Sequence, residues 1–149
     1  MLDFKCQSLS VINMKLAGRE YRKYSHAIGC ISVHLCWIPK RRRKVLISQV
    51  KQDLYEILHE VALEKGWLIK ALEIAPDHVH LLVEYDTSHA VNQVVKAFKG
   101  RSSKLLRDKY PHLKRMPSMW TRGYFHDSTG KVSTAVIMAY INDPHHDKE

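Results

Sequence analysis

Two histidines form the first pattern in this sequence that indicates chemistry. His78 and His80 are separated by one residue in the segment HVHLLVEY, which we expect to form a β-strand after the turn at residues 76–77. Residues two apart in a β-strand point to the same face, so both imidazoles can reach one metal ion. Imidazole suits Mn²⁺ and other transition metals, whereas Mg²⁺ alone prefers oxygen ligands, so the pattern leaves the metal open. Two ordinary, partly buried histidines fit the same pattern.

The tyrosine at position 140 is the second candidate. Tyr140 lies in residues 131–141, which we expect to form the last helix. A phenol has an ordinary pKa of about 10 and becomes a useful nucleophile when its charge is offset, which an adjacent metal ion can do. From helical periodicity alone, we would predict that Tyr140 is a packing residue on the apolar side of this helix.

This last helix is apolar nearly all the way round, which suggests that it is covered on two sides. The apolar arc and the residues that extend it are Val132, Val136, Ala139 and Tyr140, and then Ile137, Met138 and Ile141. The second cover is either the rest of the same domain or another subunit. We predict a homodimer in which this helix contacts the partner.

The elements that position these residues follow the order strand, helix, strand, strand, helix, strand, helix. Their expected ranges are 26–38, 48–66, 67–75, 78–85, 88–107, 120–126 and 131–141. Ser48 and Ser88 are the expected N-caps of the two long helices. This order is that of a split β-α-β unit, so we predict an α+β, ferredoxin-like fold with a largely antiparallel sheet and an added C-terminal helix that carries the tyrosine.

Length and composition favour one folded domain. The chain has 149 residues, of which 45% are hydrophobic, and this is enough for a single core. Residues 1–25 show no clear periodicity and are expected to form an N-terminal arm. Residues 26–149 are expected to form one catalytic domain.

The charge of the chain favours a polyanionic partner. Lysine and arginine number 24 against 15 acidic residues, so the formal net charge is +9, and nucleic acid is the first partner that we expect. The three cysteines show no CxxC spacing, which favours neither a disulfide framework nor a zinc knuckle. No secretory signal or membrane-spanning run is visible, so we expect a cytoplasmic protein with no membrane partner.

Three groups of residues are candidates for contact with DNA. A basic run follows the first expected strand, a second group lies on the second long helix, and a third combines a cation with an aromatic ring near the fourth strand. These residues are Lys40, Arg41, Arg42 and Arg43, then Lys99, Arg101, Ser102 and Ser103, then Arg122 and Tyr124. A basic run that is simply solvated is the alternative interpretation.

Four blocks of sequence resemble a known family when taken together. They are IAPDHVHLLVEY, AFKGRSSKLLRDKYPHLK, MWTRGYFHDSTG and the terminal AYIN, in this order. Their residues and spacing resemble the TnpA-type insertion-sequence transposases, the single-strand DNA transposases of the HUH superfamily with one catalytic tyrosine. The resemblance runs from about His26 to the C-terminus.

The resemblance implies an enzyme that cleaves and rejoins single-stranded DNA. Tyr140 would attack a phosphate and form a 5′-phosphotyrosine, leaving a free 3′-hydroxyl that can later rejoin strands. His78 and His80 would bind Mg²⁺ or Mn²⁺. The family also implies an obligate dimer, in which the tyrosine helix can complete the partner's site, and DNA with hairpin ends as the substrate.

One position departs from the family pattern. The family usually carries a glutamine four residues after the tyrosine as a further metal ligand, and here that residue is Pro144, which has no side-chain donor atom. Asn142, Asp143 and His145 are the nearby substitutes. The departure also favours an alternative, a decayed or domesticated transposase that binds structured single-stranded DNA without cutting it. A metallo-phosphoesterase that uses water as its nucleophile is a third possibility.

Overall fold

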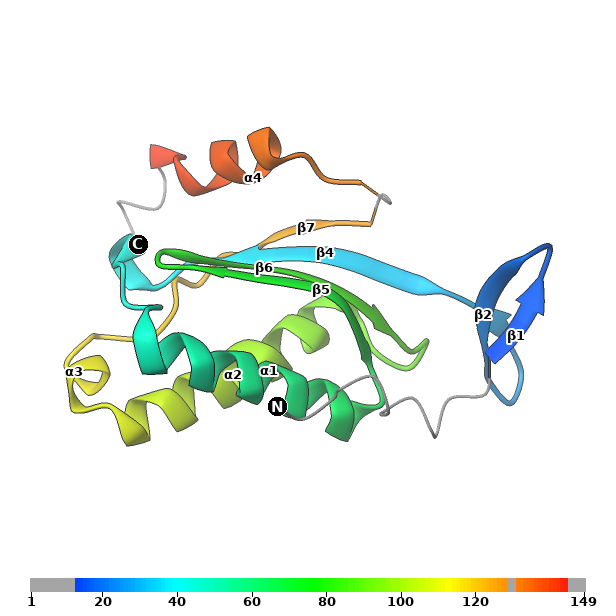
Figure 1. The fold of residues 1–149 in the computed structure, drawn as a ribbon, viewed down its shortest axis with the longest axis horizontal. Helices are drawn as coiled ribbons and strands as arrows, with labels where there is room; N and C mark the ends of the chain where they lie inside the picture. The colour runs from blue at the N-terminus through cyan, green and yellow to red at the C-terminus, as the bar shows by residue number, and fades with distance from the viewer. Residues whose placement is uncertain (1–12, 129–130, 145–149) are drawn as a thin grey trace.

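The computed structural model describes residues 13–128 and 131–144, and in this part of the chain the strands form two separate sheets (Figure 1). The strands are β1 Asn13–Leu16, β2 Arg19–Lys23, β3 Ile28–Gly29, β4 Ile31–Trp37, β5 Leu68–Ala75, β6 His78–Tyr85 and β7 Phe125–Asp127. The helices are the 3₁₀ turn η2 Lys40–Arg42, then α1 Ser48–Lys65, α2 Val91–Lys109, α3 Pro111–Lys114 and α4 Thr134–Ile141. None of these helices combines the length and the apolar character needed to cross a membrane.

The larger sheet has the strand order β5-β6-β4-β7, and every neighbouring pair is antiparallel. Helix α1 connects β4 to β5, and β6 lies between these two strands. This is a split β-α-β unit, and α2 with β7 completes it. The predicted ferredoxin-like fold with a C-terminal helix is confirmed.

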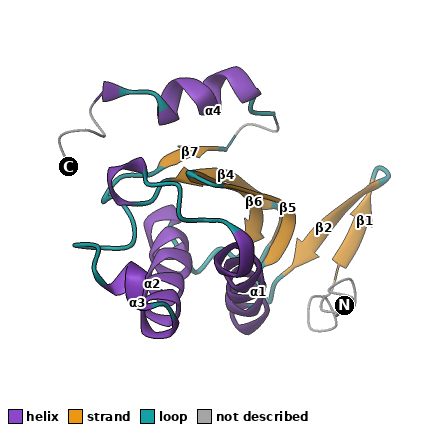
Figure 2. Cartoon of the chain, turned by 60° about the vertical axis from the view of Figure 1, so that its left-hand side comes forward, coloured by secondary structure: helices purple, strands orange, loops and turns teal. Residues whose placement is uncertain are grey.

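Helices lie on both faces of this sheet (Figures 1 and 2). Helices α1 and α2 cover one face, where Leu35 and Trp37 of β4 and Leu81 of β6 are completely buried. Helix α4 lies over the opposite face. Because side chains alternate along a strand, the residues of β4 and β6 point in turn to the main core and to the opposite face, part of which α4 covers.

Helix α4 packs on the sheet through one narrow stripe. Ile137 and Ile141 are buried against Cys36 and Ile38, which follow the alternation of β4 on the face opposite the main core. Val136 and Met138 are 45% and 40% exposed, so apolar side chains also lie on the side of α4 that faces away from the sheet. Within the described part of the chain, α4 is covered on one side only. The helix begins at Thr134, not at Lys131, because Ser133 caps it by accepting a hydrogen bond from the Val136 amide.

The N-terminal residues contain strands that the sequence pattern did not predict. β1 and β2 form a hairpin around Ala17 and Gly18, whose φ angles are positive, and β3 adds a third short strand. The hairpin projects from one end of the molecule (Figure 1). Residues 1–12 of the expected arm lie outside the described residues.

Other predicted boundaries were also wrong. The first strand was predicted at 26–38, but β4 covers only Ile31–Trp37, and Ile28–Gly29 belong to the smaller sheet. The N-cap of α1 is Ile47, and Ser48 is already inside the helix. The N-cap of α2 is Ala90, whose amide donates to Gln93 Oε1, because Ser88 instead donates to the Asp86 carboxylate. Trp120 forms only an isolated bridge with Pro39, and strand β7 starts five residues later than expected.

Candidate functional site

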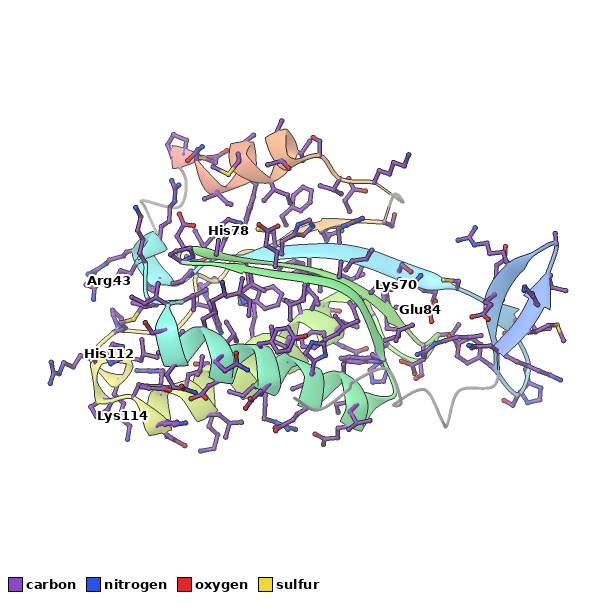
Figure 3. All side chains as sticks on the ribbon, viewed as in Figure 1. Arg43, Lys70, His78, Glu84, His112 and Lys114 are labelled. Atoms are coloured by element: carbon purple, nitrogen blue, oxygen red, sulfur yellow. The ribbon has the colours of Figure 1, made fainter. Side chains whose placement is uncertain are left out.

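Both histidines of the predicted pair lie on β6, on the face of the sheet that α4 covers. Val79, between them, is completely buried in the opposite core, so alternation places His78 and His80 together on the other face. His78 is the first residue of β6, at the end of the sheet next to the β5–β6 turn (Figure 3). The two imidazoles are therefore on adjacent same-face positions at the end of a strand.

Asp77 holds the first imidazole. Its Oδ1 lies 3.0 Å from His78 Nδ1, and its Oδ2 accepts a hydrogen bond from Arg42 Nε at 3.0 Å. Burial by itself would raise the pKa of Asp77, but the hydrogen bonds from His78 and Arg42 and the charge of Arg42 outweigh it and lower that pKa. An ionised carboxylate only accepts, so the proton of the bond lies on His78 Nδ1. In the neutral ring, Nε2 of His78 then keeps a free lone pair, as in the carboxylate–histidine pairs of metal sites.

The second imidazole faces another histidine. His34 of β4 is 7% exposed, and its Nδ1 lies 3.3 Å from His80 Nε2. Burial lowers the pKa of His80, and the neighbouring His34 adds to this effect. His80 is therefore neutral near pH 7, the form of imidazole that binds a metal.

Tyr140 lies on the same side of the sheet as the imidazoles. Its side chain packs on the cluster formed by Cys36, Ile38, Ile137 and Ile141, with its ring centroid 5.7 Å from that of Phe125. Cys36 is the direct strand partner of His80. The Tyr140 hydroxyl oxygen is buried in the single chain. The fold thus brings the tyrosine helix onto the strand next to the histidine strand.

The predicted third ligands lie at the end of α4. Asn142 and Asp143 are exposed and follow the helix directly, and Pro144 is exposed beside them. His145 lies outside the described residues. In residues 13–128 and 131–144, no three His, Cys, Asp or Glu side chains are grouped closely enough to hold a metal ion.

Three of the predicted DNA-binding residues surround one surface hollow of about 270 Å³. Lys99 of α2 and the loop residues Arg122 and Tyr124 line it, together with Lys96. Lys99 Nζ also donates to the backbone oxygens of Thr121 at 2.6 Å and Gly123 at 3.1 Å. Lys99 therefore fixes the loop that presents the arginine and the tyrosine.

The other predicted residues of α2 lie apart from this hollow. Arg101 donates to Glu64 of α1 through Nη2 at 2.7 Å. Ser102 drops out of the predicted DNA-binding set because it is completely buried, donates to the Phe98 carbonyl and accepts from Trp120 Nε1. Ser103 is half-buried and continues the row of Lys96 and Lys99 at helical spacing.

The basic run lies at the end of β4, close to the histidine end of the sheet (Figure 3). Lys40 is half-buried, and Arg41 and Arg43 are exposed. Arg42 is held by Asp77. One member of the run therefore supports the His78 site, while the exposed members remain available to a polyanion.

Sequence reasoning missed His34. Local pattern gave no signal for it, because its contact with His80 joins residues 46 apart in the chain. In the ferredoxin-like order the first and third predicted strands are neighbours. Using this pairing would have placed His34 and His80 on adjacent strands.

The comparison with protein families is decisive at this point. The sequence model of the family "Transposase IS200 like" matches residues 28–144, which is most of the chain. The chain belongs to the IS200-like transposase family. The predicted membership is confirmed, and the chain is a transposase of this family.

Individual relatives of this IS200-like transposase agree with that assignment. The ISDra2 transposase TnpA of Deinococcus radiodurans is 34% identical over 133 residues, which cover 87% of this chain and 94% of the relative. The transposase for insertion sequence element IS200 of Salmonella typhimurium is 32% identical over 125 residues, 82% of each chain.

Solved structures show the same fold. A crystal structure of a Deinococcus radiodurans protein described as a transposase matches with a TM-score of 0.74 and 33% identity, covering 80% of this chain and 94% of that one. A REP-associated tyrosine transposase bound to a REP hairpin matches with a TM-score of 0.51, covering 80% of this chain and 67% of that one. At 13% identity the second match shows a shared fold alone.

Proposed function

We propose that this transposase cleaves and rejoins single-stranded DNA through a 5′-phosphotyrosine at Tyr140, with a divalent metal ion held by His78 and His80. The observation that carries the proposal is the packing of α4. Ile137 and Ile141 rest on Cys36 and Ile38, and Cys36 is the strand partner of His80. A phenol and two imidazoles on one face of a sheet match the parts that such a reaction needs.

The chemistry of the two imidazoles fits a divalent metal. Asp77 fixes the tautomer of His78 so that Nε2 can coordinate, and the lowered pKa keeps His80 neutral. Bound Mg²⁺ or Mn²⁺ would polarise the scissile phosphate and offset developing charge. Arg42 supports the site indirectly, since it holds the second oxygen of Asp77.

The tyrosine supplies the covalent step. The phenol loses its proton, and its oxygen forms a bond to phosphorus while the bond from phosphorus to the 3′-oxygen breaks. The leaving oxygen takes up a proton and becomes a 3′-hydroxyl, so the protons balance. Rejoining reverses these bonds, so no high-energy cofactor is needed. Because the Tyr140 hydroxyl is buried in the single chain, attack requires α4 to shift.

A homodimer is part of the proposal because α4 keeps an exposed apolar side. Val136 and Met138 are exposed there. Replacing both with glutamate should convert a dimer to a monomer, and light scattering on the eluted protein measures this. Leu63→Glu, at an exposed apolar position on α1, is the matched control. A dimer that survives the double substitution contradicts the assignment of α4 as the interface.

Single-stranded DNA with hairpin ends is the proposed substrate. The exposed cations Arg41 and Arg43 and the hollow lined by Lys96, Arg122 and Tyr124 offer charge for phosphates and a ring for an unpaired base. These two basic surfaces are separate parts of the same domain.

The decisive experiment compares Tyr140→Phe with the native chain on single-stranded DNA from the two ends of the element that encodes it, with Mn²⁺ present. A covalent protein–DNA adduct should form with the native chain and with Tyr55→Phe, a control on the other side of the sheet. It should be lost in Tyr140→Phe. An adduct that persists in Tyr140→Phe shows that Tyr140 is not the nucleophile.

The same experiment separates the two alternative functions. Pro144 in place of a ligand residue favours a module that binds structured single-stranded DNA without cutting it. That module predicts tight, salt-sensitive binding with no adduct in any variant. A metallo-phosphoesterase that uses water predicts cleavage without an adduct, unchanged in Tyr140→Phe.

A further inference from the structure

The β1–β2 hairpin is a basic extension outside the matched region of the family, which begins at residue 28. It projects from the end of the sheet opposite to His78 (Figures 1 and 3). Glu20 is the one acidic residue among residues 13–24, against Lys15, Arg19, Arg22 and Lys23. Because Arg22 is buried, the exposed charges of the hairpin are three cations, Lys15, Arg19 and Lys23, against one acid.

A buried ion pair fixes the direction in which the hairpin points. The Arg22 side chain is 6% exposed, and its Nε donates to Glu84 Oε2 at 2.8 Å. Its Nη2 donates to the Gly66 carbonyl at 2.7 Å, which also ties β2 to the end of α1. Both oxygens belong to the catalytic domain. The hairpin is thus docked at its base on β6, with defined inner and outer faces.

Strand alternation assigns residues to those faces. Because Arg22 points into the domain, Tyr21 and Lys23 point away from it, and Arg19 shares their face. Lys15 and Glu20 are strand partners and share the opposite face, where their charges offset each other. We define the outer face as Met14, Leu16, Arg19, Tyr21 and Lys23.

The outer face combines cations with an aromatic ring. The Arg19 guanidinium carbon lies 5.3 Å from the centroid of the Tyr21 ring, and Leu16, the partner of Arg19, is 47% exposed. Arg19 and Lys23 are exposed on either side of Tyr21. Bases stack on aromatic rings and on arginine guanidinium planes, while flanking cations bind phosphates. This combination is the chemistry that recognises unpaired nucleic acid.

We propose that the outer face of the β1–β2 hairpin binds single-stranded DNA independently of its sequence, as a second contact beyond the histidine end of the sheet. The inference rests on the proposed function for the kind of nucleic acid. The exposed charge of this face is positive only, which complements a phosphate backbone. A single DNA strand that contacts both the hairpin and the histidine end of the sheet would run along the length of the domain.

The experiment measures binding of the full chain to an oligothymidine of twenty nucleotides over a range of salt concentrations. Arg19→Gln with Lys23→Gln should reduce the slope of log affinity against log salt by about 1.4, since each single-strand phosphate contact contributes about 0.7. Tyr21→Ala should weaken binding roughly tenfold with an unchanged slope, because stacking carries no counterion release. Lys15→Gln, on the inner face, is the matched control and should change neither quantity.

Three outcomes would overturn the inference. One is an unchanged affinity and slope in Arg19→Gln with Lys23→Gln. Another is an equal loss of affinity and slope in Lys15→Gln, which would mean that DNA binding depends only on the net charge of the hairpin. The third is a change in oligomeric state with unchanged DNA binding, which would make the face a protein interface. Thermal melting by circular dichroism confirms folding of each variant, and the polar Arg19 and Lys23 substitutions keep the test valid if Tyr21→Ala unfolds.

Failure of this inference is distinguishable from failure of the proposed function. Oligothymidine binding needs no cleavage and no element-specific sequence. If no variant forms an adduct but binding still depends on the outer face, the proposed reaction is wrong and the inference holds. If adducts form normally and the outer-face variants bind like the native chain, the reaction stands and the inference is wrong.

Discussion

Nδ1 of His34 lies 3.3 Å from Nε2 of His80, and no other described residue bonds to Nε2 of His34. One ring must donate the proton of this contact. If His80 donated, the proton of His34 would lie on its buried Nε2 and remain unpaired, and buried N–H groups are rarely left so. The favoured arrangement has His34 donating to His80. The lone pair of His80 Nε2 then accepts this hydrogen bond, and a metal ion would have to compete with it.

His34→Phe should therefore strengthen Mn²⁺ binding. The substitution keeps the ring shape and removes a hydrogen bond with a net value of about 1 kcal/mol, which predicts roughly fivefold tighter binding. Isothermal titration calorimetry measures the affinity, and His126→Phe, on an exposed position of β7, is the control. Weaker binding in His34→Phe would mean that His34 orients His80 for the metal instead of competing with it.

Glu84 should make the stability of the protein depend on acid. Burial alone would raise the pKa of Glu84, but the hydrogen bond from Cys30 and the charges of Lys70 and Arg22 outweigh it and lower that pKa below 4.5. A lowered folded-state pKa stabilises the fold above the unfolded value, and this contribution is lost as pH falls through the folded value.

Glu84→Gln should thus cost about 2 kcal/mol at pH 7, the value of a hydrogen bond to a charged group. The cost should shrink as pH falls below 4.5, because the unfolded chain then takes up the proton first, and the native carboxylate does so only at its lowered pKa. Urea unfolding from pH 7 to pH 3 measures both. Glu64→Gln, which breaks an exposed pair with Arg101, should have little effect. A cost for Glu84→Gln that is independent of pH contradicts the lowered pKa.

The sequence predicted the ferredoxin-like core because its strands and helices carry strong local patterns. Alternation in β6 placed Val79 in the core and His80 on the opposite face without any knowledge of the partners. The hairpin around Arg22 could not be found in this way. Its strands are mostly exposed, and its anchor, Glu84, lies 62 residues away.

Boundaries failed where a side chain had a stronger partner elsewhere. Ser88 is a good N-cap by type, but its hydroxyl donates a hydrogen bond to the Asp86 carboxylate, and α2 starts at Val91. Ser102 looked like a phosphate contact by its neighbours, but Trp120 needs a buried acceptor for its indole N–H, and Ser102 supplies it. Such choices depend on contacts between segments, which local sequence does not specify.

Cys36 should be chemically inert in the folded protein. Burial, with a smaller contribution from the charge of Asp77, raises the pKa of the Cys36 thiol from 9.0 to about 12. The thiolate is the reactive form, so iodoacetamide at pH 8.5 should label Cys36 only after unfolding. Peptide mass spectrometry locates the label, and the half-buried Cys30 is the internal comparison.

The same shift makes stability fall in strong base. Above pH 9 the thiol ionises in the unfolded chain while it stays protonated in the fold, so this contribution is lost as pH rises towards 12. Cys36→Ala should lose stability less steeply over that range. Rapid labelling of native Cys36 at pH 8.5 is the result that would contradict its burial beneath α4.

Lys99 should matter for DNA binding as a brace more than as a charge. Its Nζ reaches the backbone oxygens of Thr121, Arg122 and Gly123 at 2.6, 3.4 and 3.1 Å, so one ammonium group holds three successive carbonyls. Lys99→Met keeps most of the side-chain length and removes these bonds. The loop should then exchange its amide hydrogens faster, and the hollow beside Tyr124 should lose its shape.

Lys96→Met provides the contrast, since Lys96 lines the same hollow, is exposed, and is one helical turn away. It should lower the salt dependence of DNA binding by about 0.7 and leave hydrogen exchange in residues 121–124 unchanged. Lys99→Met should instead raise hydrogen exchange in this loop. It should also weaken binding at every salt concentration, because Arg122 and Tyr124 are no longer held in position to contact the DNA. Equal effects of the two substitutions on exchange and on salt dependence would mean that Lys99 acts only through its charge.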